Sequence, residues 1–363
     1  MKVAFVVFDL SLYGGAERVT ANIANRLSDS MDVSMISICG KNIVPPFELD
    51  SRITIYEIGV EKARIRQMMK SGRNMLRAFF KEHSFDVVLA EGHFAGLLLL
   101  PCCIFKRNNF VFCDHGSIMS QWKSKGKTLG RFIMALCYHR TVVVTERSRE
   151  AYLKKFHLSK KKIICIYNWL DDRYVENSGE YDSKTKKIIS VGRFGKEKGY
   201  DMLVKAAKKV MPNHSEWEWH IYGDGETFES TKKAILESNL EKQVILKGAV
   251  GNISELYKEY AFLVLPSYRE GLPLVLLEAQ ANNLPLVSFD IITGPNEIIS
   301  DGINGYLIPR YDIEKMAVHM GKLMDDEKLR ADFSKHSQDN LDRFSPETIQ
   351  KQWTGLFYEM KRR

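Results

Sequence analysis

The chain has 363 residues, of which 45% are hydrophobic and 27% are charged. This length and composition are typical of two soluble globular domains, and they exclude a disulfide-rich miniprotein, a fibrous repeat and a disordered chain. The longest apolar run, residues 94–105, is about 12 residues long, whereas a membrane-spanning helix needs ~20. The sequence therefore excludes a polytopic membrane protein.

The net charge of +8 is unevenly distributed along the chain. Residues 1–170 carry 26 Lys and Arg against 14 Asp and Glu, whereas residues 171–363 carry 27 against 31. An excess of positive charge in one half indicates an anionic partner for that half, either nucleic acid or an acidic membrane face. A basic surface that meets only solvent is the alternative interpretation.

The cysteines and the N-terminus predict a cytoplasmic protein. All six cysteines lie in the first half and none forms a CxxC pair, which argues against a zinc site and favours reduced, buried thiols. The N-terminal sequence MKVAFVVFDL has a short apolar core without a small-residue cleavage site. We interpret it as a first buried strand rather than a signal peptide.

In the first half, short buried strands alternate with amphipathic helices. Strands are predicted at residues 3–8, 33–38, 53–57, 86–90, 110–113, 142–144 and 163–166. Helical periodicity predicts helices that include residues 16–27, 65–80 and 146–156. Apolar strands that alternate with helices are typical of a doubly wound parallel sheet.

A second series of the same kind follows a polar linker, predicted at residues 171–186 and centred on Asn177-Ser178-Gly179. Strands are predicted at residues 187–191, 217–222, 243–246, 262–265, 286–288 and 305–308, with helices that begin near Gly199, Glu226, Ile253, Leu272 and Pro295. After residue 311 only helical patterns remain. The chain is therefore expected to fold as two Rossmann-like domains, residues 1–170 and 187–344, with a helical tail at residues 345–363.

Three turns that follow predicted strands have features of anion binding. The first strand leads to Gly14-Gly15 at the start of a helix, where backbone N–H groups can face an anion. The strand at residues 187–191 leads to a loop with Arg193 and Lys198, where the two cations could hold a diphosphate. Gly223-Asp224-Gly225 follows the next strand at the same edge of the sheet. Each pattern alone also fits an ordinary turn or a basic loop.

The most informative stretch runs from Pro266 to Glu278. Glu270 lies in a glycine-containing loop, and Glu278 is expected about two turns into the helix that starts near Leu272. Because that helix is apolar, Glu278 is expected to be partly buried, which is costly unless the carboxylate is paired. Two carboxylates can accept hydrogen bonds from the hydroxyls of a sugar and of a ribose. A surface Glu beside a capped one is the alternative.

These motifs together resemble the retaining GT-B glycosyltransferases of family GT4. The resemblance rests on Glu270-x7-Glu278, on the upstream cations and on the Gly14-Gly15 turn, and it extends to residues 294–299 and 301–305. In the first half it includes Asp114-His115-Gly116 and Tyr167-Asn168. The similarity is closest to the branch that builds bacterial capsule, O-antigen and lipid-linked glycans. It implies two Rossmann-like domains that face a central cleft, with a C-terminal helix that crosses back to the first domain.

The resemblance also implies a role for each site residue. Arg193 and Lys198 would hold the donor diphosphate, Glu278 would bind the ribose, Glu270 would face the transferred sugar, and His115 would lie near donor and acceptor. The implied catalytic residues are Glu270, His115, Arg193 and Lys198. The implied donor-binding residues are Gly14, Gly15, Arg193, Lys198, Gly223, Gly225, Glu270, Gly271, Leu272 and Glu278.

The expected reaction transfers a hexose or N-acetylhexosamine, with retention, from a UDP-linked donor to a glycan or lipid-linked acceptor. No cofactor or metal is expected, because no Asp-x-Asp motif is present. A GDP-mannose-dependent mannosyltransferase and a phosphorylase or epimerase of the same fold remain alternatives. An NAD-dependent oxidoreductase is disfavoured because GxGxxG is absent. A nucleic-acid-binding protein is disfavoured because aromatic residues do not alternate with the basic residues of the charged helix face.

A basic stripe in the helix predicted at residues 65–80 suggests a membrane partner. Arg66, Lys70, Arg73 and Arg77 recur at helical spacing, and apolar residues occupy a neighbouring face. Such a helix can lie on an anionic membrane, so peripheral attachment to the inner face of the cell membrane is expected. A solvated basic face over a buried apolar one is the alternative.

Overall fold

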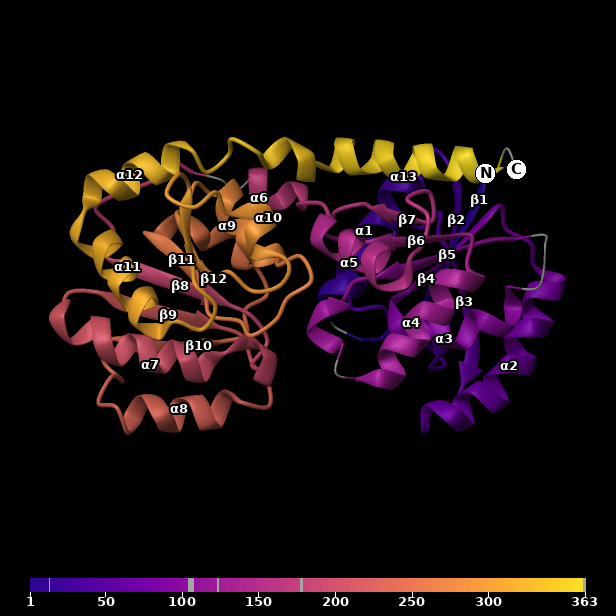
Figure 1. Ribbon diagram of the computed structural model, residues 1–363, viewed down its shortest axis with the longest axis horizontal. Helices are drawn as coiled ribbons and strands as arrows, with labels where there is room; N and C mark the ends of the chain where they lie inside the picture. Colours follow the sequence, from indigo (N-terminus) through magenta and orange to yellow (C-terminus); the bar gives the residue numbers. More distant parts are fainter. Residues whose placement is uncertain (13, 104–107, 123, 177–178, 362–363) are drawn as a thin grey trace. The chain divides into compact units, whose positions relative to one another are not determined.

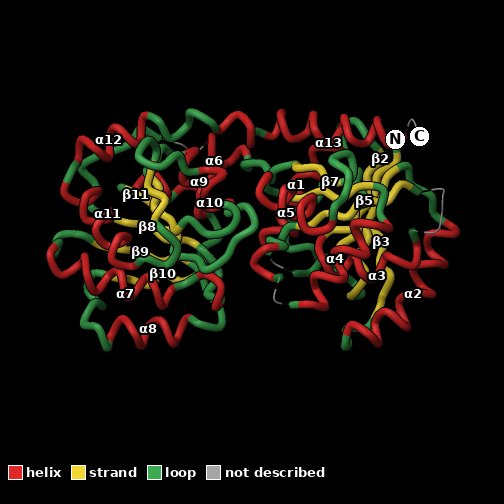
Figure 2. The backbone as a smooth tube through the Cα atoms, viewed as in Figure 1, coloured by secondary structure: helices red, strands yellow, loops and turns green. Residues whose placement is uncertain are grey.

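The computed structural model describes residues 1–12, 14–103, 108–122, 124–176 and 179–361. These residues form two compact units: unit 1 consists of residues 1–169 with 347–363, and unit 2 of residues 170–346. Figure 2 shows the strands of each unit as an inner layer flanked by helices. The end of the predicted apolar run, residues 104–105, and the centre of the predicted linker, residues 177–178, lie outside the described residues.

Unit 1 contains a seven-stranded sheet with the order β3-β2-β1-β4-β5-β6-β7 (Figure 1). Its strands are β1 (Lys2–Val7), β2 (Asp32–Cys39), β3 (Thr54–Val60), β4 (Val87–Glu91), β5 (Asn109–Asp114), β6 (Arg140–Val143) and β7 (Ile163–Cys165). Neighbouring strands are parallel, and β1 pairs with both β2 and β4. The direction of winding therefore reverses between β1 and β4, which confirms the predicted doubly wound sheet.

Among the described residues, five α-helices of unit 1 lie between its strands in the chain, and a sixth is the last helix of the chain. They are α1 (Gly15–Leu27), α2 (Ile65–Glu82), α3 (Gly92–Leu99), α4 (Lys125–Cys137), α5 (Glu146–Phe156) and the C-terminal α13 (Pro346–Lys361). Arg140 Nη2 contacts Glu359 Oε1 at 2.6 Å, and Asn109 Nδ2 donates to Met360 O at 3.3 Å. These contacts hold α13 on unit 1, although the chain of unit 2 precedes it.

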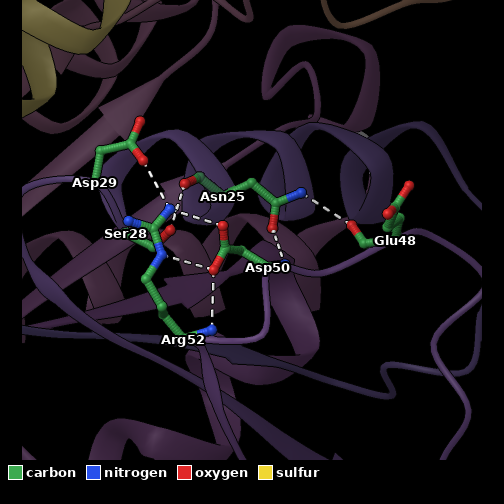
Figure 3. A network of polar contacts seen from close by, with 6 residues as sticks. All are labelled: Asn25, Ser28, Asp29, Glu48, Asp50 and Arg52. Carbon is green, nitrogen blue, oxygen red and sulfur yellow. Dashed lines mark hydrogen bonds and ion pairs between the residues drawn. The ribbon is translucent and has the colours of Figure 1, made fainter.

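The C-terminal end of α1 is held by a network of polar contacts (Figure 3). Asn25 Nδ2 donates to Glu48 O, and Asn25 Oδ1 accepts from Asp50 N, both at 2.9 Å. Arg52 Nη2 contacts Asp29 Oδ1 and Asp50 Oδ2, each at 2.7 Å. The network ties α1 to the segment that leads into β3. The opposite end of α1 begins at Gly15, just beyond the carboxyl end of β1.

Unit 2 contains a six-stranded parallel sheet with the order β10-β9-β8-β11-β12-β13. Its strands are β8 (Lys187–Val191), β9 (Glu218–Tyr222), β10 (Val244–Gly248), β11 (Phe262–Leu265), β12 (Leu286–Phe289) and β13 (Gly305–Ile308). Its helices are α6 (Asp172–Glu176), α7 (Tyr200–Val210), α8 (Phe228–Leu236), α9 (Leu274–Ala281), α10 (Pro295–Ile298), α11 (Ile313–Asp325) and α12 (Glu327–Lys335). Winding reverses between β8 and β11, as in the first sheet.

Unit 2 differs from the sequence expectation at three places. The helix expected near Ile253 is two 3₁₀ turns, Ile253–Glu255 and Tyr257–Glu259, which end at the extended Tyr260. The helix α9 begins at Leu274 rather than Leu272, because Pro273 disfavours helical geometry at the residue before it. Within the segment expected to be a linker, α6 lies in unit 2, and Asn282 Nδ2 donates to Tyr174 O at 3.2 Å.

The apolar side of α2 is buried inside unit 1. Leu76 and Phe80 belong to a core cluster that also contains residues of β4 and β5. Arg66, Lys70 and Arg73 are exposed, and so is Met69. Arg77 is half-buried, and its Nε donates to Pro101 O at 3.3 Å. This is the geometry of a basic face over a buried apolar one. Leu76 and Phe80 are therefore not available to a bilayer.

Within the described part of the chain, no helix has the length and apolarity that a membrane crossing requires. None of the six cysteines, which all belong to the described residues, forms a disulfide. Cys39, Cys102 and Cys113 are buried, Cys103 and Cys165 are half-buried, and Cys137 is exposed.

Candidate active site

The candidate residues of unit 2 follow the carboxyl ends of the neighbouring strands β9, β8 and β11, all on loops except Glu278, which lies on α9. The loop after β8 carries Arg193 and Lys198, and the loop after β11 carries Glu270, Gly271 and Leu272. These two strands flank the point where the winding of the sheet reverses. Ligands of open α/β sheets bind beyond the strand ends at such a reversal. The fold thus brings these predicted residues to the expected place.

Backbone contacts hold the loops after β8 and β9 against each other. Phe194 N donates to Asp224 O at 2.8 Å. Gly223 has a φ of 136°, and a Cβ there would lie 2.0 Å from Gly192 O; a Cβ on Gly225, with a φ of 146°, would lie 2.8 Å from Phe194 O. Both positions therefore require glycine for reasons of backbone geometry and loop packing. Glycine is therefore needed at these two positions whether or not a ligand binds beside them.

Lys198 and Glu270 form an ion pair across the winding reversal. Lys198 Nζ lies 2.8 Å from Glu270 Oε1, which also accepts from Ser267 Oγ at 2.7 Å. Both charged side chains are mostly buried, so this pair is less screened than a surface pair. The predicted diphosphate-binding cation and the predicted sugar-facing carboxylate therefore form an ion pair with each other.

Arg193 is placed differently from Lys198. Its side chain is 74% exposed, and Nη2 lies 3.1 Å from Glu197 Oε1. Burial alone would raise the pKa of Glu197, but a backbone hydrogen bond and the nearby Arg193 and Lys198 charges lower it. Because exposed ion pairs contribute little, Arg193 is held weakly and its guanidinium can turn toward an anion.

The loop after β11 is supported by the loop after β12. Thr293 Oγ1 donates to Glu270 O at 2.7 Å. A Cβ on Gly294 would lie 2.5 Å from Gly271 O, which shows how closely the two backbones approach. Leu272 is buried, so it anchors the loop through the core. The donor-binding role implied for Gly271 and Leu272 would therefore rest on backbone groups.

Glu278 is almost fully buried, at 3% exposure, and is the fifth residue of α9. It lies about one turn into the helix rather than the expected two, because α9 starts later than predicted. Tyr257 Oη donates to Glu278 Oε2 at 2.8 Å from a 3₁₀ turn before β11. The pairing that a buried carboxylate requires is thus provided by a residue outside the motif.

We expect Glu278→Gln to weaken nucleotide binding roughly tenfold or more without unfolding unit 2. A hydrogen bond to a charged group contributes about 1.5–3 kcal/mol, and the amide keeps an oxygen that can accept from Tyr257. The matched control is Tyr257→Phe, which removes the inner hydrogen bond and leaves the carboxylate charged. Calorimetric titration with UDP checks both variants. Equal binding by Glu278→Gln and the unaltered protein would remove the ribose role.

In unit 1, the Gly14-Gly15 turn lies at the start of α1, beyond the end of β1. Both residues have room for a side chain: a Cβ on Gly15 would meet nothing within 4 Å, and one on Gly14 would meet chiefly the flexible Glu17 carboxylate. Gly14 has a φ of −149°, which is ordinary extended backbone. Packing within unit 1 therefore does not explain why glycine occupies these positions.

His115 pairs with Glu91 at the carboxyl ends of β5 and β4. His115 Nε2 lies 2.6 Å from Glu91 Oε2, and His115 Nδ1 is buried without a hydrogen-bond partner among the described residues. Burial alone would lower the pKa of His115, but the hydrogen bond and charge of Glu91, with the charges of Asp114 and Glu17, raise it above 6.5. The imidazole is thus biased toward its charged form.

A buried network holds the backbone next to His115. Arg131 Nε lies 2.6 Å from Asp114 Oδ2, which also accepts from Tyr152 Oη at 2.7 Å. Asp114 Oδ1 accepts from Gly116 N at 3.1 Å, and Arg131 Nη1 donates to Gln121 Oε1 at 2.7 Å. The network joins β5, α4, α5 and the loop after His115, and so keeps that loop in one position.

The raised pKa of His115 predicts a pH-dependent stability. A raised folded pKa contributes stability that is fully present below the unfolded value of 6.5 and is lost as pH rises through the folded value. We expect Glu91→Gln to be less stable than the unaltered protein at pH 5.5, and the difference to shrink at higher pH. Urea unfolding across this range, with an NMR titration of His115, checks the prediction. A gap that widens with pH would contradict it.

Several residues of the site were not predicted from local spacing. Ser267 and Tyr257 bind the two predicted carboxylates, and Arg131 binds Asp114. In the described ranges, no group of three or more His, Cys, Asp and Glu side chains could hold a metal ion.

Two family profiles match consecutive parts of the chain. The profile described as "Glycosyltransferase Family 4" matches residues 13–174, and the one described as "Glycosyl transferases group 1" matches residues 174–340. The junction between the two matches lies close to the boundary between units 1 and 2.

Three curated relatives align over nearly all of the chain. An uncharacterized glycosyltransferase of Haemophilus influenzae is 28% identical over 98% of this chain and 99% of its own. The amylovoran biosynthesis glycosyltransferase AmsD of Erwinia amylovora is 25% identical, with the same two shares. A Campylobacter jejuni enzyme, named as an alpha-1,4-N-acetyl-D-galactosaminyltransferase that acts on a diNAcBac-PP-undecaprenol-linked GalNAc disaccharide, is 24% identical over 99% of both chains.

Solved structures of the same architecture are also similar. A point mutant of TarM from S. aureus, in complex with Fondaparinux, alpha-GlcNAc-glycerol and UDP, matches with a TM-score of 0.82 and 17% identity. The match covers 98% of this chain and 99% of that chain. At this identity the likeness establishes the fold.

Proposed function

The chain belongs to the GT4 family of glycosyltransferases, has the GT-B fold and acts in surface glycan biosynthesis, and from this premise we propose the reaction that it catalyses. A hexose or N-acetylhexosamine moves from a UDP-linked donor to a glycan or lipid-linked acceptor. The anomeric configuration is retained and no metal ion takes part.

The observation that carries this proposal is the Lys198–Glu270 pair at the winding reversal of unit 2. A donor diphosphate placed beside Lys198 competes with Glu270 for the ammonium group. Because Lys198 and Ser267 both bind Oε1 of Glu270, Oε2 is left, among the described residues, to accept from a hydroxyl of the donor sugar. One ligand thus satisfies both partners of the pair.

Positive side chains perform the electrostatic work in this mechanism. Negative charge develops on the departing UDP phosphate, and Lys198 and Arg193 stabilise it without reorganisation of water. Glu278 holds the ribose before the reaction begins. The Gly14-Gly15 turn presents backbone N–H groups at a helix start, and the open space around Gly15 would let a ligand approach the backbone.

Names of relatives support the choice of donor and acceptor. The Campylobacter jejuni relative is named for an undecaprenol-diphosphate-linked acceptor and an alpha linkage, which is the linkage that retention from an α-linked nucleotide sugar would produce. The related S. aureus structure contains UDP. A lipid-linked acceptor would place the enzyme at the inner face of the membrane, where Arg66, Lys70 and Arg73 of α2 favour an anionic surface.

A panel of UDP- and GDP-linked sugars, read by nucleotide release, tests the proposal. We expect release from one UDP-sugar, undiminished by EDTA, and an NMR spectrum of the product that shows the anomeric configuration of the donor. Heat-treated protein and a reaction without acceptor are the controls. An inverted product, or loss of activity in EDTA that added metal restores, would show the assignment to be wrong. A preference for GDP-mannose would favour a mannosyltransferase instead.

A further inference from the structure

The helix α4 of unit 1 exposes an apolar ridge. Leu129, Ile133 and Leu136 are 58%, 39% and 50% exposed. They follow one another at steps of four and three residues, so they lie within an arc of about 60° on one side of the helix. Trp122, in the turn just before α4, is 40% exposed. We call these four residues the α4 ridge.

The α4 ridge is not the core-facing side of the helix. Gly130, Arg131, Met134 and Ala135 are buried, and they lie on the opposite side of α4. Met134 belongs to the same core cluster as residues of β5, and Ala135 packs with Tyr152 of α5. One side of α4 therefore packs on unit 1, and the other side exposes three large aliphatic side chains.

Lysines surround the ridge. Lys155 Nζ lies 4.8 Å from the centre of the Trp122 ring, and Lys162 Nζ donates to Leu136 O at 3.0 Å. Lys125 is exposed and lies one turn before Leu129 on the same side of α4. Residues 122–137 contain no Asp or Glu. The surface thus combines apolar side chains with positive charge, which is the composition of an interfacial membrane-binding helix.

We propose that the α4 ridge is the surface that inserts into the headgroup region of an anionic phospholipid bilayer. The inference rests on the proposed function, because a lipid-linked acceptor is presented at such a bilayer. It differs from the sequence expectation, which assigned this role to α2. Leu76 and Phe80 of α2 are buried in the core, which leaves Met69 and Met75 exposed at 36% and 40%. The helix α4 instead exposes three large aliphatic side chains beside lysines.

A second copy of the chain fits the ridge less well than a bilayer. In a two-fold dimer the same patch meets itself, so Lys125 and Lys155 of one copy would face those of the other. Like charges brought together without acidic partners repel. Anionic lipid headgroups provide the missing negative charge, and the acyl boundary accepts the aliphatic side chains.

Binding of the full chain to vesicles of equal parts phosphatidylglycerol and phosphatidylcholine tests the proposal. The ridge variant carries Leu129→Gln, Ile133→Gln and Leu136→Gln, and the matched α2 variant carries Arg66→Gln, Lys70→Gln and Arg73→Gln. We expect the ridge variant to partition roughly tenfold more weakly or worse, and the α2 variant to lose less. Brominated lipid should quench tryptophan fluorescence of the unaltered protein, and Trp122→Phe should remove most of that quenching.

Three results would overturn the proposal. They are absence of binding by the unaltered protein, equal binding by the ridge variant, and quenching that persists in Trp122→Phe. A ridge-dependent dimer in sedimentation velocity, without lipid binding, would identify a second copy as the occupant instead. Nucleotide release with a water-soluble acceptor analogue should be the same in all variants. If neither the unaltered protein nor any variant released nucleotide, the proposed function would be wrong, whereas the measurement of lipid binding would still decide the role of the α4 ridge.

Discussion

Replacing Lys198 with Gln is expected to lower the turnover number by about 10²–10³-fold, the usual cost of losing one group that stabilises developing charge. The amide can still donate to Glu270 Oε1, so the loop after β11 keeps a partner while the positive charge is lost. Arg193→Ala is expected to have an effect in the same direction. Because Arg193 is exposed, its loss should change the free energy of unfolding by less than about 1 kcal/mol.

The matched control for Lys198 is Lys196→Ala, which removes the same charge two residues away from an exposed position in the same 3₁₀ turn. Steady-state kinetics with saturating donor, below the melting temperature of each variant, separates turnover from folding. If Lys196→Ala reduced turnover as strongly as Lys198→Gln, a general positive field rather than a defined contact would explain the effect. Full activity of Lys198→Gln would remove Lys198 from the mechanism.

The strands could be predicted from the sequence because the pattern of a buried strand is contained in a few consecutive residues. Each strand of the structure overlaps a predicted one, since a buried parallel strand is a short apolar run between turn residues. Boundaries shifted where a neighbour acted on the backbone, as Pro273 did at the start of α9. Periodicity alone also could not distinguish an α-helix from the two 3₁₀ turns at residues 253–259.

The residues that contact the site residues could not be predicted in the same way, because they lie far away in the sequence. The motif placed Glu270 and Glu278, but Tyr257 reaches Glu278 from 21 positions earlier. Lys198 and Glu270 are 72 positions apart, and their contact follows from the adjacency of β8 and β11. Such pairs depend on strand order, which no local spacing encodes. Their discovery changes the interpretation of Lys198 from a free cation to a paired one.

The basic helices α2 and α4 of unit 1 show another limit of prediction from the sequence. Periodicity separates the faces of a helix but does not say which face is buried. The regular basic stripe of α2 led to the prediction of membrane binding, but Leu76 and Phe80 of this helix are part of the core. The less regular α4 lacks such a stripe, yet it exposes Leu129, Ile133 and Leu136. Only the packing of each helix on the sheet distinguishes the two cases.

Replacing Arg131 with Met is expected to destabilise unit 1 by about 3–5 kcal/mol, because it leaves the buried Asp114 carboxylate without its cation. Tyr152 and Gly116 still donate to Asp114, but they carry no charge. The double variant Arg131→Met with Asp114→Asn removes the uncompensated charge and should recover part of the loss. Hydrogen exchange measured by mass spectrometry should place the effect in peptides of unit 1 and leave those of unit 2 unchanged.

The pH dependence of this loss follows from the pKa of Asp114. Burial alone would raise that pKa, but Arg131, with Tyr152 and Gly116, holds it below 3.8. A lowered folded pKa contributes stability that is present above the unfolded value and is lost as pH falls through the folded one. In Arg131→Met the carboxylate would take up a proton more readily, so the stability gap to the unaltered protein should narrow as the solution is acidified. A gap that stays constant down to pH 4 would mean that lost packing of the arginine side chain, rather than the unpaired charge, causes the destabilisation.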